Sequence, residues 1–178
     1  MPYPIRTQIR TIFIVIGGVY AGFSLLMLGM IWLQQRMLQN FGPPDDPERQ
    51  GAHMLDSFYD IHDVMLTYAP AAIALGMCYL GYGLVYRRYA GVAPAVLAVL
   101  TVAGLVFAYL YAARTVEVMS GMFRDFPTGP DVPLLFEHFD SFTAVSSYVQ
   151  MAIYFLVPQA VLAWKLRQAG RAEAEQAP

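Results

Sequence analysis

The residues best suited to chemistry are carboxylates and imidazoles that precede two of the chain's long apolar runs. Before one run, four of them recur at i, i+3, i+7 and i+10, which predicts that they share one helix face: His53, Asp56, Asp60 and Asp63. Before another run stand Glu137, His138 and Asp140. Carboxylate and imidazole ligands together suit Zn, Mn or Fe. If the two groups converge, they predict a divalent-metal site.

The same acidic residues have a simpler structural interpretation. A helix that extends into water needs a polar face, and carboxylates near a helix N-terminus interact favourably with the helix dipole. Asp56 and Asp140 are also suited to capping a helix N-terminus. The spacing matches no sharply defined metal motif, so the sequence leaves both interpretations open.

Arg114 and Glu117 form a second candidate group, three residues apart at the end of an apolar run. They are spaced to form an ion pair, and with His62 and Asp63 they would line an ion or proton path. A snorkelling pair at the membrane interface is the simpler interpretation, because no Asp, Glu, Lys or Arg lies within any apolar run.

The sequence does not indicate other kinds of chemistry. All three histidines lie outside the apolar runs, so a haem held between helices within the bilayer is not expected. The chain has no P-loop, GxSxG, HExxH or dinucleotide fingerprint, and an enzyme is the less favoured class. Its 11 Lys and Arg residues are too few and too scattered for binding nucleic acid.

The elements that must position these residues are membrane spans. Of 178 residues, 57% are hydrophobic and only 13% are charged, against about 25% charged in soluble domains. Four uncharged apolar runs, each close to the roughly 20 residues that cross a bilayer as a helix, cover residues 12–33, 64–86, 92–113 and 144–164. We therefore expect an all-α integral membrane protein, a four-transmembrane-helix bundle forming one membrane domain over residues 1–178.

The distribution of charge predicts the orientation of the chain. One side of the predicted membrane holds seven basic residues: Arg6, Arg10, Arg87, Arg88, Lys165, Arg167 and Arg171. The opposite side holds most of the acidic residues. The positive-inside rule then places both termini in the cytoplasm and the acidic loops outside, and we expect a bacterial cytoplasmic (inner) membrane. Residues 171–178 are polar and are expected to form a disordered tail.

A faint internal repeat divides the chain into two predicted hairpins, residues 1–88 and 89–170. The segment 37–41 (MLQNF) resembles 122–126 (MFRDF), and the tripeptide Asp-Ser-Phe occurs at both 56–58 and 140–142. Within each half, a turn rich in Gly, Pro and Asp lies between the first matching segment and the tripeptide. The order of these matches predicts tandem helical hairpins related by a pseudo-twofold axis along the membrane normal.

Small residues predict where helices approach one another. Gly18 and Gly22 form a GxxxG pair, and Gly104, Ala108 and Ala112 form a second stripe. We expect both to pack within the monomer, with a dimer seam as the alternative. For function, the sequence favours a non-catalytic subunit, accessory or assembly factor whose partners are the lipid bilayer and other membrane subunits or a second copy. The alternative is a metal- or ion-handling protein with the acidic and histidine cluster at its outer mouth.

Overall fold

A computed structural model describes residues 3–39, 52–124 and 139–175 as a bundle of four long helices. These are α1 (Tyr3–Gln39), α2 (Ala52–Val85), α3 (Ala93–Arg124) and α5 (Phe139–Ala174), with a short 3₁₀ turn, η1 (Ala90–Val92), before α3. Each is long and apolar enough to cross a membrane. The expected four-helix integral membrane bundle is confirmed.

The helices extend well beyond the apolar runs. With 37 residues and a rise of about 1.5 Å per residue, α1 is longer than the roughly 30 Å of hydrocarbon that it must cross. The 34-residue α2 begins well before its apolar run, which starts at residue 64. At the C-terminus, residues 171–174 continue α5, so this part of the expected disordered tail is helical. Its alanines and its Arg and Glu residues favour extension of an existing helix.

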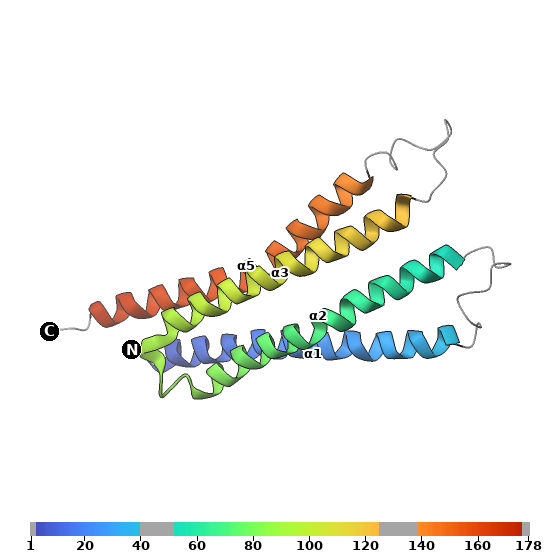
Figure 1. The fold of residues 1–178 in the computed structure, drawn as a ribbon. Coiled ribbons are helices and arrows are strands. Elements are labelled where there is room, and N and C mark those ends of the chain that lie inside the picture. The colour runs from blue at the N-terminus through green and yellow to red at the C-terminus, as the bar shows by residue number, and fades with distance from the viewer. Residues whose placement is uncertain (1–2, 40–51, 125–138, 176–178) are drawn as a thin grey trace.

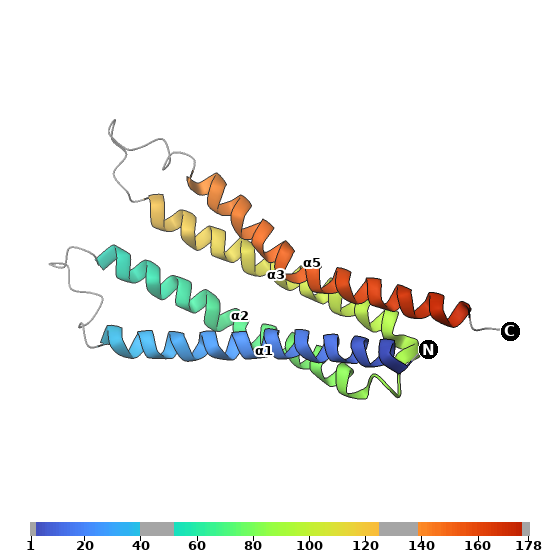
Figure 2. The same ribbon diagram turned by 180° about the vertical axis from the view of Figure 1, so that it is seen from behind.

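The four helices pair as two hairpins. Helix α1 packs along α2, and α3 packs along α5, while α2 and α3 form the main contact between the pairs and α1 touches α5 only sparsely. Figures 1 and 2 show the N-terminus, the C-terminus and the α2–α3 turn at one end of the bundle. From that end the hairpins diverge toward the other (Figure 1). The pseudo-twofold axis and the duplication stay predictions.

Glycines set the close approach of α1 and α2, but they are not the predicted pair. A Cβ on Gly17 would lie 2.5 Å from the Leu80 nitrogen, and one on Gly76 would lie 2.6 Å from the Ala21 nitrogen. At Gly18 and Gly22 nothing lies within 4 Å of the added Cβ. The expectation that Gly18 and Gly22 pack within the monomer is therefore wrong, because these residues lie on a neighbouring face of α1 that α2 does not cover.

The predicted small-residue stripe of α3 does pack inside the bundle. Ala108 and Ala112 are buried, and a Cβ on Gly104 would lie 3.0 Å from Cδ1 of Phe155. These small side chains leave room for aromatic rings. Rings from all four helices contact one another along the bundle axis, with neighbouring centroids 5.1–6.2 Å apart, in the order Tyr86, Phe13, Tyr79, Tyr20, Phe155 and Phe107.

Candidate functional site

Five of the seven residues of the predicted outer metal cluster lie outside the side chains that the structure describes: His53, Asp56, Glu137, His138 and Asp140. Helix α2 is continuous from Ala52, which keeps the backbone positions of the first two in register with Asp60 and Asp63. Both of these aspartates are exposed. Within the described part of the chain, no three His, Cys, Asp or Glu side chains gather closely enough to hold a metal. The metal site stays a prediction.

Arg114 and Glu117 form an ion pair, with Nη1 of Arg114 2.6 Å from Oε2 of Glu117. Their side chains are 49% and 68% exposed. This is consistent with an ion pair on the outer surface of one helix, formed by residues one turn apart. His62 is buried away from solvent, and its Nε2 lies 2.8 Å from Oε1 of Gln34 on α1. His62 thus links α2 to α1 through a hydrogen bond.

A buried polar cluster that the sequence interpretation missed lies at the centre of the bundle. Gln159 on α5 is only 6% exposed. Its Nε2 donates to the Tyr79 hydroxyl on α2, and its Oε1 lies 3.3 Å from the Thr101 hydroxyl on α3. Three helices are thereby joined through one amide. A neutral Gln among apolar residues produces no charge signal, although an amide in a span is costly without partners.

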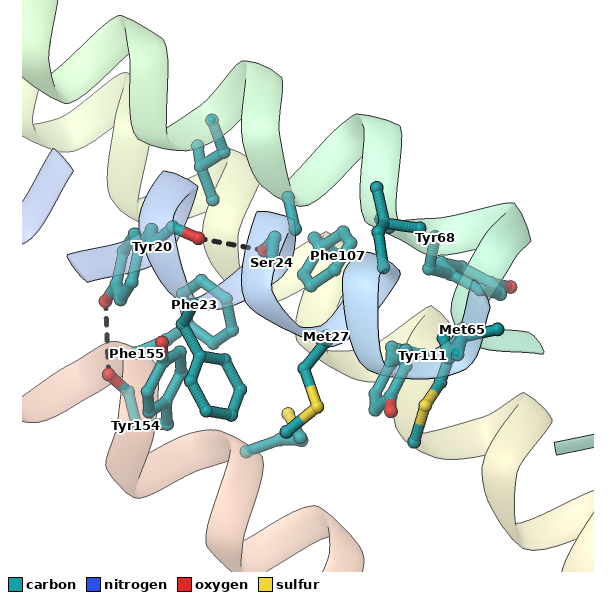
Figure 3. A pocket seen from close by; sticks show the side chains of 16 residues that line it. Tyr20, Phe23, Ser24, Met27, Met65, Tyr68, Phe107, Tyr111, Tyr154 and Phe155 are labelled. Atoms are coloured by element: carbon teal, nitrogen blue, oxygen red, sulfur yellow. Dashed lines mark hydrogen bonds between the residues drawn. The ribbon is translucent and has the colours of Figure 1, made fainter. Parts of the chain in front are cut away.

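Beside this cluster, a tyrosine on α1 donates a hydrogen bond to a backbone carbonyl of α5 that lacks its usual helical donor. Pro158 has no amide hydrogen, so it cannot donate to the carbonyl four residues earlier, which belongs to Tyr154. The Tyr20 hydroxyl donates to that carbonyl oxygen at 3.1 Å (Figure 3). Inside a bilayer, a carbonyl freed by proline is satisfied by a neighbouring helix, a Ser or Thr side chain or an ordered water, and here a neighbouring helix supplies the donor. The sequence indicates the orphaned carbonyl, but not which helix supplies the donor.

A cavity of about 130 Å³ lies between all four helices, next to Tyr20. Its wall is almost wholly apolar and contains no Asp, Glu, Lys, Arg or His. Figure 3 shows the aromatic and methionine side chains gathered around it. The rings and thioethers come from every helix: Tyr20, Phe23, Met27, Met65, Tyr68, Phe107, Tyr111, Met151, Tyr154 and Phe155.

One hydroxyl group gives this apolar wall a polar character. Tyr154 lines the cavity from α5, and no group in the described part of the chain accepts a hydrogen bond from its phenol. Phenols donate readily to carbonyl or ether oxygens. The cavity is therefore suited to binding an apolar molecule that carries an acceptor.

Comparison of this chain with protein-family models, with characterised proteins and with solved structures finds no match.

Proposed function

We propose that this small integral membrane protein is a non-catalytic subunit or assembly factor that binds a transmembrane helix of another protein through one open face of α1. The observation that carries the proposal is a strip of glycines on that helix, Gly18, Gly22 and Gly29. At 100° per residue these three positions fall within about 40° of one another. No atom lies within 4 Å of a Cβ added at any of them.

Glycines facing outward need an explanation because they do not improve the packing of the helix against lipid. Acyl chains pack equally well against Leu or Val, whereas small residues allow another helix backbone to approach closely. The same chain uses this device internally, where Gly17 meets Gly76 across the α1–α2 contact. Large exposed residues, including Leu25 and Trp32, adjoin the strip and would flank a docked helix.

A photo-crosslinking amino acid at Leu25 in native membranes tests this role. We expect crosslinks to a transmembrane segment of a different polypeptide, and loss of those crosslinks in a Gly18→Leu, Gly22→Leu double variant. The matched control is Gly81→Leu on α2, where an added Cβ also meets open space. It should leave the crosslinks unchanged. Crosslinks to lipid alone, or a pattern unaffected by the double variant, would contradict the proposal.

The alternative is a metal- or ion-handling protein whose outer mouth is the predicted cluster. It is supported by the unbroken course of α2 from Ala52, which keeps the spacing of His53, Asp56, Asp60 and Asp63 on one helix face. A shared site would also require the outer ends of the two hairpins to approach each other. Stabilisation by Zn or Mn that disappears in an Asp56→Ala, Asp140→Ala variant would favour this alternative.

A further inference from the structure

We propose that the cavity between the four helices binds a lipid-soluble molecule with a single six-membered ring bearing oxygen acceptors, as in the head group of a benzoquinone. This is a ligand site, separate from the open face of α1, and it does not depend on the role proposed for that face. Four properties of the cavity support it: its size, its aromatic wall, its phenol donor and its position relative to the bilayer.

The size of the cavity selects one ring. An apolar protein cavity of about 150 Å³ stays dry and binds benzene. At about 130 Å³, this cavity has room for one ring of that size, and because it is open on one side a fused system of three rings would extend out of it. An apolar tail on the ring would have to leave the cavity.

The wall presents ring faces and edges in several directions. Tyr68 meets Phe107 and Tyr111 nearly perpendicularly, at interplanar angles of 73° and 86°. On the other side, the Tyr20 ring lies 5.1 Å from that of Phe155. Aromatic rings prefer such edge-to-face and offset contacts, so a flat guest ring finds favourable orientations here. Methionine thioethers on three helices adapt to an irregular guest and contact rings favourably: Met27, Met65 and Met151.

The Tyr154 phenol argues for an acceptor on the ring. A hydroxyl beside an apolar space without a partner loses the hydrogen bond that water would provide. A lipid acyl chain would fill the cavity but leave the hydroxyl of Tyr154 unpaired. A ring with oxygen substituents would fill the same space and accept a hydrogen bond from it. No charged side chain lines the cavity, so an ionised ligand is disfavoured.

The arrangement of the helices gives the ligand a route from the bilayer. Cavity residues come from α1 and α5, the two helices that contact each other least among neighbours. The two hairpins also diverge away from the end that holds the termini (Figure 2). A ring entering between α1 and α5 would leave its apolar tail among lipid chains, which suits a membrane-soluble compound.

Binding is tested with decyl-benzoquinone as the probe, using the purified full chain in lipid nanodiscs. Isothermal calorimetry and thermal denaturation are the readouts. Decylbenzene, which has the same tail and ring but no oxygen, should bind about tenfold more weakly, because it loses roughly one hydrogen bond. A decyl-anthraquinone, whose outer rings would remain outside the cavity, should bind more weakly. Equal affinity for all three probes would reflect partition into lipid and would overturn the proposal.

Matched variants locate the binding. Ala72 lines the cavity, whereas its neighbour Ala71 is exposed and does not. We expect Ala72→Leu to abolish the saturable binding and Ala71→Leu to leave it unchanged. Tyr154→Phe preserves shape and should reduce benzoquinone affinity to that of decylbenzene. If the Ala72→Leu variant binds like the parent, the ligand does not occupy this cavity, and if the Tyr154→Phe variant does, the proposed hydrogen bond is wrong.

Discussion

Polar groups within the bilayer are costly without a partner, and two of the hydrogen bonds that satisfy them link helices that are distant in sequence. The Tyr20 hydroxyl bonds the Tyr154 carbonyl, and Gln159 bonds Tyr79. In hydrocarbon there is no water to replace a lost partner, so the cost of losing one falls on the fold. These contacts therefore decide which helix faces meet.

The bond between Tyr20 and α5 gives a prediction with an internal rescue. Tyr20→Phe leaves the Tyr154 carbonyl without a donor and should lower the free energy of unfolding by about 1–2 kcal/mol. Pro158→Ala restores the missing amide donor within α5. In that background, Tyr20→Phe should cost much less. Thermal denaturation of the parent, both single variants and the double variant in detergent measures the coupling. Additive effects would show that the tyrosine does not serve this carbonyl.

At the scale of the element, α1 presents three distinct faces. One carries Gly17 against α2, a second carries Tyr20 toward α5, and the third carries the open strip of Gly18 and Gly22. Because an α-helix turns by about 100° per residue, adjacent glycines in the sequence have different surroundings. Gly17 and Gly18 are neighbours in the chain, yet only the first permits a helix contact within the monomer.

The close approach of α1 and α2 is tested by adding a single methyl group. Gly76→Ala would place its Cβ 2.6 Å from the Ala21 nitrogen, which must force the helix backbones apart. We expect it to destabilise the protein by about 1–3 kcal/mol, as overpacking does. Gly81→Ala on the same helix meets nothing within 4 Å and should be neutral or slightly stabilising. Equal melting temperatures for the two variants would contradict the tight contact.

On the scale of the whole molecule, four spans place both termini and the α2–α3 turn at one end (Figure 1). The basic residues predict that this end is cytoplasmic. In a Cys78→Ala background, Asp46→Cys and Asp131→Cys should react with a membrane-impermeant thiol reagent in intact cells. Tyr89→Cys and Gln176→Cys should react only after permeabilisation. Labelling of Tyr89→Cys in intact cells would reverse the orientation.

Much of the fold follows from composition alone. An uncharged apolar run of about 20 residues has only one stable arrangement of its backbone in a bilayer, which is a helix. For this reason the four helices and their order were predictable from residue type. The Arg114–Glu117 contact is similarly local, because residues three apart share a helix face.

Which helix faces meet was decided only by the tertiary structure. Lipid and helix interiors are equally apolar, so hydrophobicity does not mark a packed face as it does in water. Sequence reasoning therefore assigned Gly18 and Gly22 to the monomer core, and overlooked both Gln159 and the aromatic cavity. Their surroundings depend on side chains from other helices, such as Tyr79 beside Gln159 and Phe155 beside Gly104. Spacing along one helix carries no information about which partner helix it faces.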